Sequence, residues 1–301
     1  MCIITAEEEE ASRRYWIKVS KTNIFARHTK PGYQAIAYSL SIASRTRAAM
    51  ILPLPVVPGS GENALKFIDL SGYPDFFIDL SRVCESEHQI EYLDFDDFDA
   101  GEENETLLVH DVGDYEASYV PTMADFGRLD PRFRLANEIW KKMPNYNNFG
   151  FAVFQLKITL SKKEEETENA VHPMAFEFPT RNSEKLFYPT VHVHDGDYHS
   201  EAGFYHTFYC QRDKARSEFK YQRDLLYRRN PTPAEKYEEA LTGPFEGYDW
   251  YLRSNDIASN LIQTNKCQGI VDPDKKLYGM VLFGDFPNSD IWLGDTVQDE
   301  K

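Results

Sequence analysis

The sequence predicts an α+β fold with a mostly antiparallel β-sheet or sandwich core and a helical C-terminal section. Along the chain, the predicted elements run strands, helices, strands and then helices, an order typical of α+β proteins. Of the 301 residues, 42% are apolar and 14% are aromatic. This composition is sufficient for a packed core and excludes a globally disordered chain.

The first strands are predicted from β-rich and alternating segments. Residues 15–19 and 22–27 are short and β-rich, and residues 34–42 alternate with a period of two, which places every second side chain on one face. Residues 50–57 are apolar but interrupted by prolines. Because proline cannot donate a hydrogen bond to a β-ladder, we expect this segment to be an edge strand or an extended rim.

Two helices are predicted after these strands. Residues 62–70 carry apolar side chains at helical spacing, and Pro74 begins a second helix that runs through Val83, since proline suits a first helical turn. The middle of the chain is then predicted to contain strands at 106–109, 115–120, 150–160, 172–178, 190–194 and 203–210, with short helices at 123–129 and 137–143.

The C-terminal part changes character. Residues 213–229 form a predicted helix rich in Lys and Arg, and further helices are expected at 233–241 and 248–255. A hairpin from 269–272 and 277–283 is expected to close the fold.

One domain over residues 1–301 is the predicted organisation. The charged connector at 161–170 leaves open a subdivision into residues 1–160 and 171–301. A solvated hairpin loop is the favoured interpretation of this connector, because predicted strands flank it directly.

The charge balance bears on the partners of the chain. It carries 33 basic and 49 acidic residues, for a net charge of −16. Such a field repels phosphates, so we expect neither nucleic acids nor anionic membranes as partners. A protein partner or a homo-oligomer remains the expectation. Neither a secretory signal nor a membrane-spanning apolar run is recognised.

The cysteines indicate a compartment. Cys2, Cys84, Cys210 and Cys267 are far apart, so the sequence has neither a zinc knuckle nor a dense disulfide framework. We expect reduced thiols in a cytoplasmic protein.

Several catalytic signatures are missing from the sequence. It contains no phosphate-binding G-x-x-x-x-G-K loop, dinucleotide G-x-G-x-x-G, hydrolase G-x-S-x-G or zincin H-E-x-x-H. Residues 94–105 hold seven carboxylates, but Phe98 and Asp99 occupy the positions where a calcium loop needs an oxygen ligand and a glycine. A solvated acidic loop is therefore predicted there.

A histidine cluster is the strongest candidate metal site. His192 and His194 share a face if they lie on a strand, and a returning strand would bring His206 beside them. Glu201 or Asp195 would add an oxygen ligand. Three neutral imidazoles with a carboxylate suit Zn²⁺ or Fe²⁺.

The same residues resemble the metal motif of cupins, in which an H-x-H is followed by a glutamate and a later histidine. Six residues separate His194 from Glu201, which is a longer spacing than in cupins. The resemblance implies a metal site at His192, His194, Glu201 and His206. The other interpretation is a His-rich hairpin turn that faces solvent.

A second candidate lies at the N-terminus. If Met1 were removed, Cys2 would combine a thiol with a free α-amino group, which can serve as its base. With residues 24–27, this start resembles that of choloylglycine hydrolases, which are N-terminal-nucleophile enzymes. The resemblance implies that Cys2 is the nucleophile and that Arg27 stabilises the oxyanion. Ala26 and His28 depart from the family pattern. An ordinary second residue is the alternative.

A third resemblance covers residues 22–80. It is carried by Asn23-Ile24-Phe25-Ala26-Arg27, by Gln34-Ala35-Ile36-Ala37-Tyr38 and by the Leu52-Pro53-Leu54-Pro55 strand end. These residues are similar to the opening of uncharacterised bacterial proteins with a domain of unknown function. This resemblance implies no activity.

Three classes of function follow from the sequence. A non-catalytic protein-interaction or structural protein is favoured, because no complete catalytic motif is recognised and aromatic residues are abundant. A metal-dependent enzyme or metal-binding protein that uses the histidine cluster is second, and an N-terminal cysteine hydrolase is third. The basic and aromatic segment 221–229 could dock an acidic partner, or pack inward as an ordinary helix.

Overall fold

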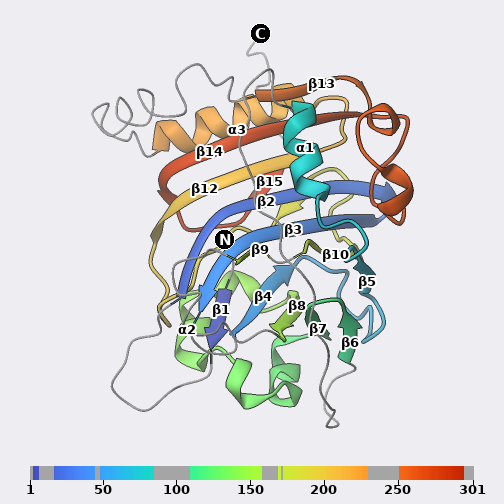
Figure 1. Cartoon of the computed structure of the whole chain (residues 1–301). Coiled ribbons are helices and arrows are strands. Elements are labelled where there is room, and N and C mark those ends of the chain that lie inside the picture. The colour runs from blue at the N-terminus through green and yellow to red at the C-terminus, as the bar shows by residue number, and fades with distance from the viewer. Residues whose placement is uncertain are drawn as a thin grey trace.

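A computed structural model describes residues 3–6, 17–44, 48–84, 109–157, 169–170, 172–229 and 251–294. Two β-sheets share one core, and helices or loops cover their outer faces (Figure 1). The mostly antiparallel sheet and the sandwich core were predicted, but residues 251–294 contain three strands, so the predicted helical C-terminal section is confirmed only at residues 215–229. The predicted segments at 94–105 and 233–241, and most of the connector, lie outside the described residues.

The larger sheet has eight strands. Seven of them follow the order β13-β14-β12-β2-β3-β10-β5, and β9 (Asn169–Ala170) pairs with β3. Their bounds are β13 Tyr251–Ile257, β14 Lys276–Pro287, β12 Glu201–Cys210, β2 Ile17–Lys30, β3 Tyr33–Ser44, β10 Met174–Pro179 and β5 Lys66–Asp69. Only β12 and β2 pair in parallel. Strands from both halves of the chain therefore lie within one sheet.

The second sheet has five strands in the order β1-β4-β8-β7-β6. They are β1 Ile3–Ala6, β4 Ala48–Leu54, β8 Gly150–Leu156, β7 Tyr115–Val120 and β6 Val109–Val112. All pairs in this sheet are antiparallel. A small sheet joins β11 (Leu186–Tyr188) to β15 (Ile291–Leu293).

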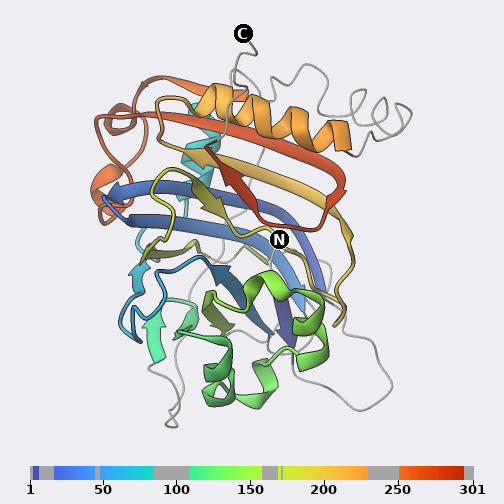
Figure 2. The ribbon, with the colours of Figure 1, turned by 180° about the vertical axis from the view of Figure 1, so that it is seen from behind.

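Helices lie outside the sheets. Helix α1 (Phe76–Cys84) crosses the outer face of the larger sheet, and α3 (Ala215–Arg229) lies along β14 on the opposite face (Figures 1 and 2). The smaller sheet is covered by α2 (Asn137–Lys142) and the 3₁₀ turns η1 (Met123–Arg128), η2 (Pro131–Phe133) and η3 (Pro144–Tyr146). Two further 3₁₀ turns are η4 (Ala258–Asn260) and η5 (Thr264–Lys266).

Three apolar clusters hold these layers together. The central one lies between the two sheets and joins residues such as Ile36, Leu52 and Phe154. The second lies under α1, where Phe76 contacts Phe25 edge to face at a centroid distance of 5.8 Å. The third lies between the smaller sheet and the helical segment 123–146. Each sheet is thus buried on both faces over part of its length.

Two predicted helices are strands. Residues 66–69 form β5 instead of a helix over 62–70, and residues 251–257 form β13 instead of a helix over 248–255. In both cases pairing with a neighbouring strand, β10 or β14, outweighs the local helical spacing. Residues 213–229 were predicted to be helical, and α3 confirms this.

The proline-rich strand β4 differs from its prediction. It is not an edge strand, because β1 pairs with one side and β8 with the other. Pro53 pairs with Phe151 of β8.

Candidate functional site

The predicted histidine cluster is brought together as a stack of rings. The His192 ring lies 5.5 Å from that of His194 and 5.3 Å from that of His206, centroid to centroid, with interplanar angles of 20° and 13°. Phe204 and Phe208 extend the stack, at 4.6 Å from His192 and 5.7 Å from His206. The cluster therefore forms an aromatic column inside the protein.

Two chain segments supply this column. His206 lies on β12, whereas residues 190–194 are extended without forming the predicted strand and make only an isolated parallel bridge from Val193 to Ile3 of β1. The Ile4 N–H donates to the carbonyl of Val193 over 2.9 Å. The segment 190–194 thus connects the two sheets at one end of the sandwich.

The turn between β14 and β15 fixes this segment. The Asn288 side chain accepts a hydrogen bond from the His192 N–H over 2.7 Å, and its amide donates to the carbonyls of His192 and His199, each over 2.8 Å. The Asn288 amide thus bonds to both the N–H and the carbonyl of His192, as the backbone of a neighbouring strand would. No sequence pattern pointed to this residue.

Asp290 fixes the same segment two residues later. Its carboxylate accepts hydrogen bonds from the N–H groups of Thr190 and Val191, over 2.8 and 3.0 Å, and from the Tyr146 hydroxyl over 2.7 Å. Burial raises the pKa of Asp290 to about 6, although these hydrogen bonds favour the charged form. The sequence did not single out this carboxylate either.

The imidazoles of His192 and His206 are buried and uncharged. His192 is 6% exposed and His206 is fully buried. Burial lowers the pKa of both far below 6.5, and the neighbouring imidazoles lower it further. The Nε2 atom of His192 is buried without a hydrogen-bond partner.

This arrangement does not match the predicted metal site. Glu201 and His206 are five positions apart on β12, so their side chains leave opposite faces of the strand. Asp195 pairs instead with the exposed His199, with 2.9 Å between Oδ2 and Nε2. Among the described residues, no group of three His, Cys, Asp or Glu side chains could hold a metal ion. The predicted ligand set of His192, His194, Glu201 and His206 is therefore not assembled as one group, and a metal at these residues stays a prediction.

Arg27, the predicted oxyanion residue, is bonded to a loop of the larger sheet. Its guanidinium donates to the carbonyl of Ile270 over 3.0 Å and of Gly269 over 2.9 Å, and it pairs with Asp272 over 3.5 Å. Burial lowers the pKa of Arg27, although the nearby negative charge of Asp272 raises it in part. Cys2 lies outside the described residues.

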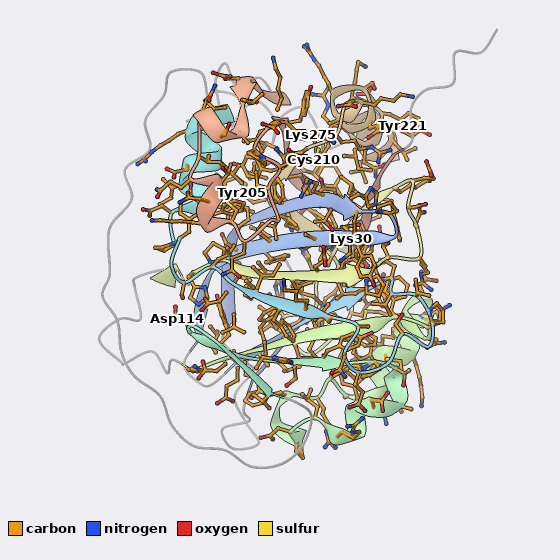
Figure 3. All side chains as sticks on the ribbon, turned by 90° about the vertical axis from the view of Figure 1, so that its right-hand side faces the viewer. Lys30, Asp114, Tyr205, Cys210, Tyr221 and Lys275 are labelled. Carbon is orange, nitrogen blue, oxygen red and sulfur yellow. The ribbon has the colours of Figure 1, made fainter. Side chains whose placement is uncertain are left out.

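The outer face of the larger sheet carries a group of side chains that are largely apolar and partly exposed. Tyr205 pairs with Phe283 across β12 and β14, with ring centroids 5.6 Å apart and nearly perpendicular. Thr207 pairs with Val281 beside them, and all four side chains are partly exposed. Figure 3 shows Tyr205 on the side of the sheet that carries α1. We call Tyr205, Thr207, Val281 and Phe283 the outer patch.

The basic segment 221–229 forms the second half of α3. Leu226 is buried in the central core, and Tyr221, Arg223 and Leu225 are partly exposed. Near the start of the helix, Arg212 donates to the buried Glu218 over 2.7 Å. The helix therefore packs inward through its apolar residues.

Comparisons with known proteins identify only distant structural neighbours. The sequence matches no known protein family. A crystal structure of baculovirus P35 is similar over 93% of this chain and 98% of that one, at 12% identity and a TM-score of 0.44. A mutated baculovirus P35 after caspase cleavage covers the same shares at 13% identity and a TM-score of 0.39. P35 in a caspase-8 complex covers 93% and 97%, at 13% identity and a TM-score of 0.38.

Among the described residues, no helix is long and apolar enough to cross a membrane. Cys210 and Cys267 are in no disulfide, and both are buried.

Proposed function

We propose that this chain acts by binding another protein and not by catalysis. The observation that carries the proposal is the outer patch, where two aromatic and two β-branched side chains remain partly exposed on a rigid sheet. Aromatic residues that are held in place and partly exposed are enriched at protein interfaces. Elsewhere in the described part, the large hydrophobic side chains most exposed to solvent are Val57 and Val109.

The polar residues that suggested chemistry support the same proposal. The Arg27 donors are directed to carbonyls and a carboxylate of the loop at residues 269–272. His192 and His206 lie within an aromatic column, away from solvent. A general acid or base must reach the atom with which it exchanges a proton, and these groups are enclosed.

The first partner to test is caspase-8, the protein found in a complex with P35. The chain and the enzyme would be mixed at micromolar concentration, and their masses followed by size-exclusion chromatography with light scattering. The proposal expects a stable complex, and an intact-mass measurement of the chain would report any cleavage. A cytoplasmic location, which we also propose, would give access to such an enzyme.

Variants test whether the outer patch is responsible. Replacing Tyr205 and Phe283 with serine should abolish the complex, because it removes both aromatic anchors. Val109→Ser is the matched control, since it removes an exposed hydrophobic side chain on β6, in the smaller sheet. Unchanged binding by the double variant, or absence of binding by the unaltered chain to caspase-8 and to proteins of its own cell extract, would contradict the proposal.

A further inference from the structure

A partly exposed arginine at one end of the sandwich has no carboxylate beside it. The Arg181 guanidinium lies over the Phe149 ring, 4.3 Å from the ring centroid, and its Nη1 atom donates to the Asn148 carbonyl over a long 3.4 Å. Among the residues that the structure describes, no carboxylate forms an ion pair with Arg181. A guanidinium has five N–H donors, so most of those on Arg181 remain available.

The electrostatics of Arg181 reflect this missing partner. Burial lowers the pKa of Arg181, and the described part of the chain supplies no charge that offsets the shift. At Arg27, by contrast, the negative charge of Asp272 raises the pKa in part. Partial removal of a charge from water costs free energy unless an opposite charge compensates for it. A carboxylate from outside the chain would provide that compensation.

An exposed apolar side chain borders Arg181. Two backbone hydrogen bonds of 3.0 Å join the segments 55–57 and 179–181 as a short antiparallel pair, and the two opposed central residues are buried. Because side chains alternate along extended segments, Val57 and Arg181 both lie on the other face of this pair. Val57 is 41% exposed. We call Val57, Phe149 and Arg181 the arginine patch.

The chemistry of the arginine patch favours a carboxylate that belongs to a polypeptide. A guanidinium pairs with a carboxylate through two parallel hydrogen bonds, and an exposed apolar neighbour gains free energy when an apolar side chain covers it. A nucleic acid is disfavoured, because the net charge of −16 repels a polyanion. The same charge opposes the approach of a second copy of the chain, whereas a single carboxylate on another protein meets less repulsion.

We propose that the arginine patch binds an aspartate or glutamate side chain of a protein partner, with an apolar residue of that partner against Val57. The carboxylate would accept hydrogen bonds from the Arg181 guanidinium, which the Phe149 ring supports from below. The arginine patch and the outer patch share no residue, so this inference goes beyond the proposed function, and each surface can bind or fail without the other.

Two blocked peptides test this inference without a protein partner. The chain, labelled with ¹⁵N and ²H, would be titrated with acetyl-Leu-Glu-Leu-amide and with acetyl-Leu-Gln-Leu-amide, which has nearly the same shape and no charge. The NMR signal of the Arg181 Nε–H group, assigned from its loss in Arg181→Met, is the readout. We expect the glutamate peptide to shift this signal and to bind about two- to fivefold more tightly, the range of a single exposed ion pair.

Variants assign the preference to individual side chains. Arg181→Met, followed through the amide signal of Val57, should bind both peptides equally. Arg181→Lys should keep part of the preference, because it retains the charge without the planar fork. Val57→Ser should weaken both peptides by the same factor. Arg216→Met is the matched control, since it removes an exposed arginine on α3, and it should leave the preference unaltered.

Several results would overturn the inference. Equal affinity of the unaltered chain for the two peptides, or a preference that survives in Arg181→Met, would contradict it. Shifts of the Arg181 signal with inorganic phosphate but not with the glutamate peptide would indicate a phosphate site instead. Shifts of this signal when the protein alone is concentrated would assign the patch to a second copy of the chain.

The caspase-8 assay separates this inference from the proposed function. The double variant Tyr205→Ser, Phe283→Ser should retain the preference for the glutamate peptide. If that preference is present but no protein binds the outer patch, the inference stands and the proposed function fails. If the unaltered chain binds caspase-8 through the outer patch but does not distinguish the peptides, the proposed function stands and the inference fails.

Discussion

Replacing His192 with phenylalanine should reduce the acid sensitivity of the fold. His192 and His206 are neutral in the folded protein, because burial holds the pKa of each far below the value of 6.5 in an exposed histidine. In the unfolded chain both would take up a proton below pH 6.5. The unfolded state therefore binds more protons at acidic pH, so the free energy of unfolding falls as the pH decreases.

The size of this effect follows from the pKa difference. For each histidine that stays neutral in the folded protein, the free energy of unfolding falls by about 1.36 kcal/mol per pH unit below 6.5. Moving from pH 7 to pH 5 therefore lowers it by about 2 kcal/mol per histidine. Asp290 acts in the opposite direction, because its pKa is raised to about 6 from 3.8. Its stabilising contribution is present at low pH and is lost as the pH rises through 6. Moving from pH 7 to pH 5 therefore adds about 1 kcal/mol to the free energy of unfolding. These three groups together should therefore lower the free energy of unfolding of the unaltered chain by about 2–3 kcal/mol.

His192→Phe removes one of the two titrations and keeps a flat ring in the column. The Nε2 atom of His192 has no hydrogen-bond partner, so the replacement forfeits no hydrogen bond there. Urea unfolding followed by tryptophan fluorescence would measure stability at pH 7 and pH 5. The variant should lose about 2 kcal/mol less than the unaltered chain between these conditions.

The control for this experiment is His199→Gln, which alters an exposed histidine of the same segment. It should retain the acid sensitivity of the unaltered chain. The reasoning is refuted if His192→Phe and the unaltered chain lose the same free energy on acidification. That result would mean that His192 is already protonated in the folded state at pH 5.

Three other substitutions test the contacts that hold the fold. Asp290→Asn should increase the loss of stability between pH 7 and pH 5 by about 1 kcal/mol, because the offsetting titration disappears; the same urea series measures this. Arg27→Met should lower the free energy of unfolding by about 2–4 kcal/mol, since two carbonyls lose their donor; an unchanged midpoint would exclude a structural role. Gly113→Ala should cost about 2–4 kcal/mol, because Gly113 has φ +57° and a Cβ there would collide with the His172 ring; thermal melting would show the loss, and wild-type stability would count against the observed turn.

The fold could be predicted where the local pattern and the long-range pairing agree. The alternation in residues 34–42 predicted a strand, and β3 lies there because β2 and β10 pair with its two edges while two apolar clusters bury its two faces. The segments 66–69 and 251–257 were mispredicted, since their helical spacing is local and their strand partners, β10 and β14, lie elsewhere in the sequence. No pattern within a short window contains that information.

The candidate site illustrates a second limit. The density of polar residues at 192–201 predicted chemistry, and the structure does bring His192, His194 and His206 together. Two features were not predicted: the column of aromatic rings around these histidines, and the hydrogen bonds from the Asn288 side chain to the backbone of His192. Asn288 is about a hundred residues away, and a single asparagine carries no signal in the sequence.

The alternation of β12 connects the two regions. On one face, His206 lies between Phe204 and Phe208 in the central core, where its imidazole is enclosed by rings. On the other face, Gly203 and Tyr205 are accessible, because α1 and the loop after β13 cover only the far end of the sheet. A one-residue shift in the register of β12 would exchange these faces and place a polar imidazole where the aromatic patch now lies. The same pairing with β14 that removes the histidine from solvent therefore creates the surface to which we assign partner binding.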